Sequence, residues 1–509
     1  LEIAVACERG AVHRRSLPSF DAALAGARRQ LALVIRGSAA IITSNEVFND
    51  WLHRSVADVA MLTSRTPAGW YPYAGIPWFS TPFGRDGLVT GLQTLWMAPQ
   101  LARGVLGFLA ATQADRLSPR QDAEPGKVLH EVRDGEMAAL GEVPFRRYYG
   151  SHDATLLFVM LAAEHWRRTA DTATAAALWP HVERALGWLD RYADPDRDGF
   201  VEYARRTESG LLQQGWKDSY DSVFHADGAL AEPPIALCEL QGYAYAARRG
   251  AADLATALGH PRRAERLRAE AAELRAQFDA AFWDEELGTY VLALDGDKRP
   301  CRVRSSNAGH ALLTGIALPE RAKRLAATLL GDAGYSGWGI RTIAGGEARY
   351  NPMSYHNGSI WPHDNSLIGL GLAKYGFQAD AARILGGLFD ASRQFELARM
   401  PELFCGFTRR DGEGPTRYPV ACAPQAWAAG AIFMLLQAAL GMEIDAPAGC
   451  VRFDNPQLPP FLDEVTIRRL RVGEGSVDLR FERDAGRVAV QVLRRRGRVE
   501  VVSGQGFEP

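Results

Sequence analysis

Residues 153–192 read DATLLFVMLAAEHWRRTADTATAAALWPHVERALGWLDRY, and this stretch decides the class of fold. Apolar residues recur at spacings of three and four on both sides of residues 171–173, which is the periodicity of an amphipathic helix. A short connection between two such helices favours an antiparallel hairpin. The stretch therefore predicts two packed helices, over 153–170 and 174–192.

The same periodicity continues through most of the chain. It predicts further helices at 45–64, 88–113, 232–259, 261–282, 306–318, 319–331, 359–374, 376–396 and 422–440. Many of these segments are rich in Ala, Leu and Arg, which favour helix. Strands and helices do not alternate, so the pattern argues against a parallel-sheet enzyme.

Several connections between the predicted helices are long and punctuated by Gly and Pro. They are 66–87, 119–152, 196–230, 335–365 and 397–421. Loops beyond ~15 residues are usually functional or disordered, and disordered segments contain few aromatic residues. These loops carry Trp78, Tyr148, Tyr149, Trp216, Trp338, Trp361 and Phe404. We therefore expect a mainly α fold, an (α/α)6 barrel of six hairpins with ordered loops that line one mouth.

The two ends of the chain differ from its middle. Short alternating β-branched runs follow residue 464, as in Val477–Phe481 and Val488–Val492, and turn residues separate them. We expect a catalytic barrel over 26–442 and a small β-rich C-terminal unit over 443–509. Residues 1–25 contain one strand-like piece, Leu1–Ala6, which indicates the remnant of an N-terminal β domain in a chain that begins with Leu.

Composition narrows the classes of partner. The 509 residues include 58 basic and 60 acidic side chains, a net charge of −2, which lacks the basic footprint of a nucleic-acid-binding protein. No apolar run approaches the ~18 residues that a membrane span needs. The six cysteines form no CxxC pair, which favours reduced thiols and a cytoplasmic location.

Two loop clusters could carry chemistry near the starts of helices. In Trp78–Gly87, adjacent Arg85 and Asp86 suit bidentate contacts to vicinal hydroxyls; alternatively, Asp86 caps the helix and Arg85 pairs with it. In Gln214–Ser219, Trp216 beside Asp218 could stack on a sugar or raise the carboxyl pKa by desolvation. From the pattern alone, Asp218 could equally well stand at the N-terminus of a helix.

Two further clusters lie later in the chain. The density of aromatic and hydrogen-bonding residues in Tyr355–Asn365 is typical of a polyol-binding wall. His356 and His363 suggest a metal, but no third ligand stands nearby, so we expect none. In Arg399–Gly406, Glu402 is either a functional carboxylate or the partner of Arg399.

Asp194–Gly199 reads DPDRDG and resembles the opening of a calcium loop. The Glu that would complete the ligand set is absent, since position 205 is Arg. We therefore interpret the segment as a solvated turn. Serine-hydrolase and P-loop motifs are missing as well.

In order and spacing, five segments together resemble the amylo-alpha-1,6-glucosidase (glycogen-debranching-like) family. They are Phe79–Gly87, Tyr148–Thr155, Gly215–Ala226, Asn357–Asn365 and Met400–Gly406. More distantly they resemble other α/α-barrel glycosidases, including mannosylglycerate hydrolases, glucosidase I and neutral invertases. The resemblance covers roughly residues 40–440.

The resemblance implies an inverting glycoside hydrolase without a cofactor, acting on an oligosaccharide or small glycoside with an α-glucosidic bond. It implies that Asp218 is the general acid and Glu402 the general base, with the two carboxyls about 6.5–9.5 Å apart. The substrate-binding residues expected from the same segments are Trp78, Phe83, Arg85, Asp86, Tyr149, Asp153, Trp216, Lys217, His356, Asn357, Trp361, His363 and Asp364.

Two other functions remain open at this point. A glycoside phosphorylase on the same barrel would keep the acid and use phosphate in place of the activated water. A non-catalytic glycan-binding protein would need neither carboxylate, so the presence of both favours the hydrolase.

Overall fold

The helical hairpin predicted at 153–192 is present in the computed structural model, which describes residues 18–504. Its helices are α6 (Asp153–Thr169) and α7 (Thr172–Tyr192), and they pack against each other. The side chain of Asp171 caps α7 by accepting from the backbone N–H of Thr174. The polar Asp171 thus ends the first helical run and starts the second.

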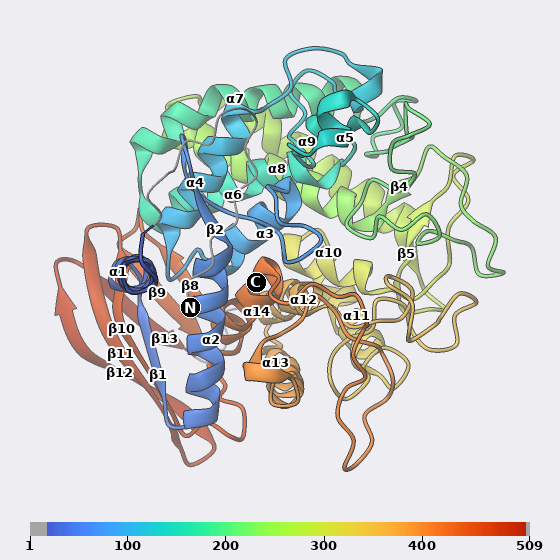
Figure 1. Cartoon of the computed structure of the whole chain (residues 1–509). Coiled ribbons are helices and arrows are strands. Elements are labelled where there is room, and N and C mark those ends of the chain that lie inside the picture. The colour runs from blue at the N-terminus through green and yellow to red at the C-terminus, as the bar shows by residue number, and fades with distance from the viewer. Residues whose placement is uncertain (1–17, 505–509) are drawn as a thin grey trace.

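A closed inner ring of helices surrounds the centre of the molecule (Figure 1). In ring order its members are α3 (Gly84–Thr94), α6, α8 (Cys238–Ala257), α10 (Gly309–Thr314), α12 (Pro362–Lys374) and α14 (Ala426–Ala439). Each contacts the next, and α14 contacts α3. Nearly every residue of α14 is buried, because a ring helix has neighbours on all sides.

A second layer of helices packs on the outside of the inner ring. Its members are α2 (Glu46–Leu62), α4 (Pro99–Ala111), α7, α9 (Pro261–Phe282), α11 (Pro319–Leu330) and α13 (Gln378–Ser392). These helices are amphipathic: α9 buries Ala264, Leu267, Ala271, Leu274, Phe278 and Phe282, one stripe at helical spacing. Each outer helix returns the chain to the end of the ring where the next inner helix starts.

One predicted helix is divided in the structure. We predicted a single helix over 88–113, whereas α3 ends at Thr94 and α4 begins at Pro99. The apolar periodicity continues through Trp96 and Met97, but Pro99 has no N–H to donate and fits the first turn of a new helix. The prediction also started one helix too early, at 232, whereas α8 begins at Cys238. Pro233 and Pro234 lie in between, and neither has an N–H to donate.

The C-terminal strands form two sheets that face each other. The first has the order β1-β10-β11-β12 and the second β13-β9-β8. The bounds are β1 (Ala40–Thr43), β8 (Met442–Asp445), β9 (Cys450–Asp454), β10 (Glu464–Val472), β11 (Gly475–Asp484), β12 (Arg487–Arg496) and β13 (Glu500–Gly504). The rings of Phe453 and Phe481, one from each sheet, lie 4.9 Å apart in the core between them.

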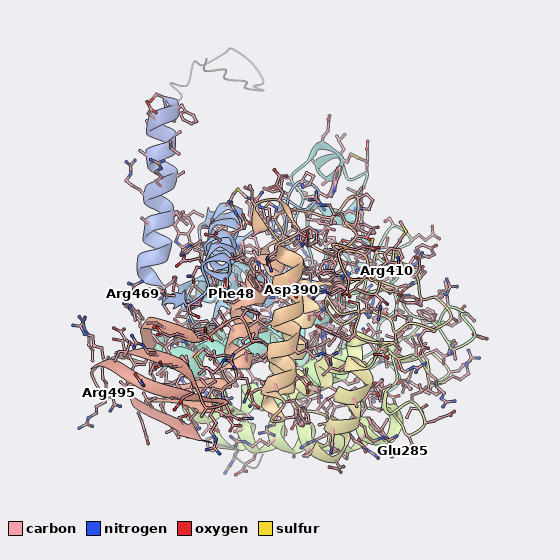
Figure 2. The ribbon with its side chains drawn as sticks, turned by 90° about the horizontal axis from the view of Figure 1, so that it is seen from below. Phe48, Glu285, Asp390, Arg410, Arg469 and Arg495 are labelled. Carbon is pink, nitrogen blue, oxygen red and sulfur yellow. The ribbon has the colours of Figure 1, made fainter. Side chains whose placement is uncertain are left out.

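The first sheet includes a strand from the other end of the chain. Strand β1 pairs antiparallel with β10, so Ile41 lies opposite Ile467. Before β1, helix α1 (Phe20–Gly37) stands out from the body of the molecule (Figure 2). Residues 20–25, assigned from the sequence to a β remnant, are therefore helical, and Leu1–Ala6 lies outside the described residues.

Short elements complete the described chain. They are α5 (Glu136–Leu140), β2 (Thr63–Thr66), β3 (Gly69–Pro72), β4 (Ala236–Leu237), β5 (Trp283–Asp284), β6 (Thr289–Tyr290) and β7 (Ala293–Leu294). Within residues 18–504, every helix is too short or too polar to traverse a lipid bilayer. The described cysteines are buried free thiols: Cys238, Cys301, Cys405, Cys422 and Cys450.

Two glycines inside helices test the packing of the outer layer. A Cβ at Gly104 in α4 would lie 2.1 Å from the carbonyl oxygen of Trp70, whereas one at Gly187 in α7 meets nothing within 4 Å. We expect Gly104→Ala to lower the free energy of unfolding by about 1–3 kcal/mol through overpacking. Gly187→Ala should raise it by about 0.5–1 kcal/mol, since alanine loses less backbone entropy. Urea unfolding followed by circular dichroism measures both, and a stabilising Gly104→Ala would contradict this packing.

Candidate active site

Arg85 joins three segments that are distant in the sequence. It lies in the first turn of α3, and its side chain is 4% exposed. Its Nε donates to Asp153 Oδ2 at 2.5 Å, and its Nη1 donates to Asp218 Oδ2 at 3.2 Å. Its Nη2 donates to the carbonyl oxygen of Gly215 at 2.7 Å. The guanidinium therefore fixes the start of α6 and the segment around Asp218 relative to α3.

The residue before Arg85 must be glycine. A Cβ at Gly84 would lie 1.9 Å from the carbonyl oxygen of Leu129. The backbone N–H of Gly84 donates to the carbonyl oxygen of His130 at 2.8 Å, which keeps the two segments this close. The close approach sets where α3 begins, and so where the Arg85 side chain starts.

Asp218 retains access to solvent. Its side chain is 29% exposed, whereas that of its partner Arg85 is almost fully buried. Burial raises the pKa of Asp218, the charge and hydrogen bond of Arg85 oppose this, and the charge of Asp153 adds to it. The net direction is upward, so the carboxyl keeps its proton to a higher pH than a free aspartic acid.

Glu402 is held by two hydrogen-bond donors. The hydroxyl of Tyr355 donates to Oε1 at 2.7 Å, and the backbone N–H of Cys422 donates to Oε2 at 3.1 Å. Burial raises the pKa of Glu402 to about 7, although both hydrogen bonds favour the ionised form; the charge of Asp218 raises it further. Glu402 therefore exchanges its proton near neutral pH.

A third carboxylate, Asp86, lies close to the other two. Burial raises the pKa of Asp86 to about 8; Arg85 opposes this, and the charges of Glu402 and Asp218 add to it. Its Oδ2 accepts a hydrogen bond from Gln425 Nε2 at 3.1 Å. Because the charges on Asp218 and Glu402 both act on Asp86, the fold brings three carboxyls from separate segments into one region.

The simpler interpretations of Asp86 and Glu402 do not hold. The N-cap of α3 is Phe83, so Asp86 lies three residues later, within the first turn, and does not cap the helix. Arg399 forms its ion pair with Asp58, at 2.8 Å, rather than with Glu402. Glu402 thus has hydrogen-bond donors but no ion-pair partner within residues 18–504.

Aromatic rings surround Trp216, which is buried beside Asp218. Its ring centroid lies 4.8 Å from that of His363 and 5.6 Å from that of Trp361, both edge to face. His363 stacks on Trp427 at 3.7 Å, and neither of its ring nitrogens has a hydrogen-bond partner in the described structure. Such edge-to-face and stacked pairs stabilise the buried segments that carry Trp216 and His363 beyond the area they bury.

Lys217 and Asp364 point to buried polar partners. Lys217 Nζ donates to Asn307 Oδ1 at 2.5 Å and to the carbonyl oxygen of Thr342 at 2.6 Å. Burial lowers the pKa of Lys217 to about 8. Asp364 Oδ1 lies 2.7 Å from His310 Nε2. These residues anchor the segments that carry Trp216 and Trp361.

His356 and Asn357 contact the residues that follow Asp218. Nδ1 of His356 accepts from the backbone N–H of Ser219 at 3.3 Å, and the amide of Asn357 donates to the carbonyl oxygen of Asp221 at 3.1 Å. The segment before α12 therefore packs directly on the loop that carries Asp218. Among the described residues, no contact of His356 indicates a metal site.

The remaining predicted residues lie at the edge of this region. Trp78 is 57% exposed, and its indole N–H donates to the carbonyl oxygen of Val420 at 3.0 Å. Phe83 is buried against His130 at 5.5 Å. The hydroxyl of Tyr149 donates to the carbonyl oxygen of Thr112 at 2.7 Å, which ties it to the end of α4.

Sequence reasoning did not assign a role to Tyr355, Cys422 or Gln425. Tyr355 stands in the polar aromatic cluster that we singled out, so its position was a usable signal. Cys422 acts through its backbone N–H, which no side-chain pattern reveals. Gln425 directly precedes α14, and a polar residue at the start of an otherwise apolar helix is the one signal that could have identified it.

The aspartates of the DPDRDG segment surround a lysine. Lys298 Nζ lies 2.8 Å from Asp196 Oδ2 and 2.7 Å from Asp198 Oδ2, and it also pairs with Glu202. Within residues 18–504, Asp194, Asp196 and Asp198 are the group whose oxygens are close enough to hold a metal ion. The ammonium group of Lys298 already supplies a positive charge next to these aspartates.

Residues 92–408, more than half of the chain, match the mannosylglycerate hydrolase MGH1-like glycoside hydrolase domain. The chain belongs to this family. Asp218 and Glu402 lie inside the matched region, and Arg85 and Asp86 precede it. A search of the curated proteins returned no match. The sequence motifs predicted a distant resemblance to mannosylglycerate hydrolases, and the family match confirms a six-hairpin glycosidase. The closer resemblance to amylo-alpha-1,6-glucosidases stays a prediction.

Solved glycosidase structures share the fold at low sequence identity. The GH78 rhamnosidase of Bacillus sp. GL1 is 17% identical with a TM-score of 0.64, over 92% of this chain and 43% of that one. The GH63 mannosylglycerate hydrolase from Thermus thermophilus is 18% identical with a TM-score of 0.54, over 75% of this chain and 99% of that one. This family member thus spans under half the length of the rhamnosidase.

Replacing Arg85 tests its role as the link between segments. In Arg85→Met, the carboxylate of Asp153, 1% exposed, loses its charged partner. Leaving a buried charge unpaired costs about 3–5 kcal/mol, and we expect that loss in the free energy of unfolding. Arg410→Met removes an ion pair with Glu413 that is exposed on both sides, 74% and 63%, and should cost less than about 1 kcal/mol. Equal losses in urea unfolding would contradict the linking role of Arg85.

Proposed function

We propose that this family member is an inverting glycoside hydrolase, with Asp218 as general acid and Glu402 as general base. The observation that carries the proposal is the convergence of the two carboxyls, from separate loops, on one region rimmed by aromatic rings. We further propose that the helices form an (α/α)6 barrel, which the closed order of the inner ring supports. The division into 1–25, 26–442 and 443–509 is part of the same proposal.

The surroundings of the two carboxyls favour these roles. Glu402 accepts hydrogen bonds at both oxygens, which stabilises the ionised form that a base requires, and its pKa of about 7 suits proton uptake at neutral pH. Asp218 has a raised pKa and an exposed edge, which suits a group that must present a proton to an incoming substrate. We assign buried Asp86 and Arg85 to the binding of sugar hydroxyls, which their closeness to Asp218 supports.

In the proposed reaction, Asp218 gives its proton to the glycosidic oxygen as the bond to the anomeric carbon breaks. Ionised Glu402 takes a proton from a water molecule, which attacks the anomeric carbon from the opposite face of the sugar. The configuration at that carbon inverts. Glu402 ends protonated and Asp218 ionised, so a proton exchange with solvent restores the enzyme.

The substrate that we propose is a small glycoside with an α-glucosidic bond. The resemblance of the sequence motifs to amylo-alpha-1,6-glucosidases supports the α-glucosidic bond. The family supports a small substrate, since its description names mannosylglycerate hydrolase. Two of the related mannosylglycerate hydrolase structures are complexes with glucose and with Tris and D-glycerate.

Proton NMR of the anomeric signal tests reaction and substrate together. The panel contains isomaltose, branched dextrin, glucosylglycerate and mannosylglycerate. We expect the inverted sugar, the β anomer from an α-glucoside, to appear first. Asp218→Asn and Glu402→Gln should each lower kcat by about 100-fold or more, as general acid–base groups do.

Two exposed carboxylates on the same loops serve as matched controls, Asp227→Asn and Glu413→Gln. Both should retain the activity of the unmodified chain. First release of the α anomer would contradict the assignment of Glu402 as base. Nearly full activity in Asp218→Asn would contradict its role as acid.

Tyr355→Phe tests the charge state of Glu402. Loss of the hydroxyl removes a hydrogen bond that favours ionised Glu402, so its pKa should rise above about 7. The base is then ionised only at higher pH, and the acid limb of the kcat/KM profile should move up by about one pH unit. Tyr350→Phe, whose hydroxyl bonds to the carbonyl oxygen of Gly406, is the control and should leave that limb in place. A shift toward lower pH in Tyr355→Phe would refute the assignment.

A further inference from the structure

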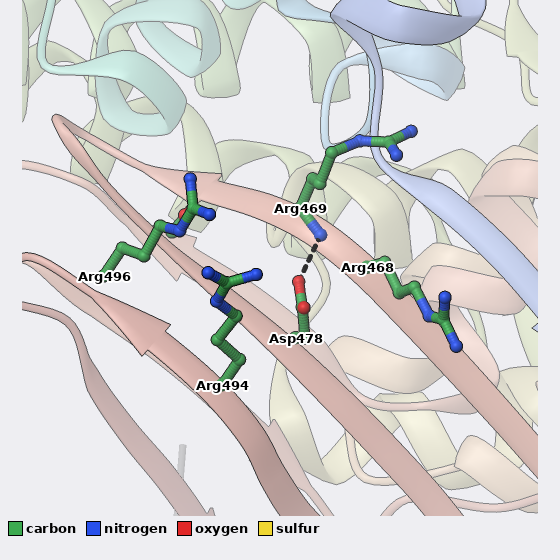
Figure 3. Close-up of a pocket in the computed structure, with 6 residues that line it drawn as sticks. Arg468, Arg469, Asp478, Arg494 and Arg496 are labelled. Carbon is green, nitrogen blue, oxygen red and sulfur yellow. Dashed lines mark hydrogen bonds between the residues drawn. The ribbon is translucent and has the colours of Figure 1, made fainter.

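Arginines line a pocket on the C-terminal sheet, built from β10, β11 and β12 (Figure 3). Its volume is about 280 Å³, and its lining residues are Arg468, Arg469, Ser476, Asp478, Arg494 and Arg496. None of these residues belongs to the loops that carry Asp218 and Glu402. The volume is just below the ~300–1,000 Å³ of typical small-molecule pockets. The pocket therefore suits a small ligand or one group of a larger one.

Strand pairing places the four lining side chains of β11 and β12 on one face of the sheet. Asp478 lies opposite Arg494 and Ser476 opposite Arg496 in the β11–β12 ladder, and residues two apart share a face of the sheet. Figure 3 shows Asp478 between the arginines of β12 and those of β10. The arrangement thus follows from the register of the sheet and not from flexible loops.

A bulge in β10 completes the pocket. The register with β11 shifts between Ile467 and Leu470, and Arg469 adopts a left-handed φ of 58°. Its backbone N–H donates to Asp478 Oδ1 at 2.7 Å, which stabilises this conformation. Bulges of this kind recur next to functional sites, where they redirect side chains.

The pocket carries an excess of positive charge. Arg468, Arg494 and Arg496 are exposed, and their side chains make no hydrogen bond or ion pair with any residue of the described range 18–504. Arg469 Nη2 donates to the carbonyl oxygen of Ser38 at 3.3 Å. One carboxylate, that of Asp478, stands among the exposed guanidinium groups of Arg468, Arg494 and Arg496, which do not lose their protons in proteins. A bound anion would relieve their mutual repulsion.

We propose that this pocket binds a phosphate group, either as inorganic phosphate or as the phosphomonoester of a small metabolite. Phosphate carries a charge of about −1.5 to −2 at pH 7, which balances the excess of the arginines better than a single carboxylate does. The planar fork of arginine matches phosphate oxygens in pairs. The site is independent of the proposed hydrolysis.

The pocket adjoins the junction between the sheet and the helices. Arg469 contacts Ser38, which lies two residues before β1, and β1 leads into α2 of the outer layer. A ligand that binds only the folded chain stabilises it by mass action. Phosphate should therefore raise the melting temperature of the whole chain in a saturable manner.

Isothermal titration calorimetry and thermal melting of the full chain at low ionic strength test the proposal. The probes are inorganic phosphate, glucose 6-phosphate, glucose and glucuronate. We expect saturable binding of the first two, at least 10-fold weaker in Arg494→Gln and in Arg496→Gln. Glucose reports binding through the sugar alone, which these variants should leave unchanged. Tighter binding of glucose 6-phosphate identifies a phosphomonoester, and equal or weaker binding identifies free phosphate.

Arg495→Gln is the matched control, because Arg495 lies on the same strand but does not line the pocket (Figure 2). It removes the same charge and should change phosphate affinity by less than twofold. An equal loss in Arg495→Gln would show a diffuse charge effect and overturn the site. Absence of saturable phosphate binding, or glucuronate binding as tight as phosphate, would overturn it as well.

Discussion

The arrangement of the candidate active site depends on the hydrogen bonds that the guanidinium group of Arg85 donates. This group is the one charged donor shared by Asp153, at the start of α6, and by Asp218, on the loop after α7, among the residues that the structure describes. The buried carboxylate of Asp153 would be costly without it. Because the same side chain also bonds to the carbonyl oxygen of Gly215, the backbone beside Asp218 is fixed along with its carboxyl.

The inner ring explains why polar residues gather at one end of the molecule. Each outer helix carries the chain back, so the inner helices all start at the same end. Asp86 and Asp364 lie in the first turns of α3 and α12, and Asp153 is the first residue of α6. Helix N-termini favour negative charge, which offsets part of the cost of ionising these buried carboxyl groups. The long loops at that end supply Asp218 and Glu402.

How far the sequence predicted the fold depends on the type of signal. Apolar periodicity located most helices, since a helix that buries one stripe must repeat it. It failed at 88–113, where the apolar run continued across Pro99, and it gave no sign that Phe20–Gly37 is helical. Nor did it indicate that β1 joins a sheet made of residues more than 400 positions later, because strand pairing depends on the whole fold.

The sequence by itself determined which residue types stand in the long loops and in the first turns of the helices, including both proposed catalytic carboxyls and the aromatic residues beside them. Only the tertiary structure decided their partners. Arg85 meets Asp218 across 133 positions, and Gln425 meets Asp86 across 339. Lys217 bonds to Asn307 and Thr342, and Arg399 to Asp58 rather than Glu402. Burial raises the pKa of Asp218 and of Glu402, and that burial arises only when the ring closes.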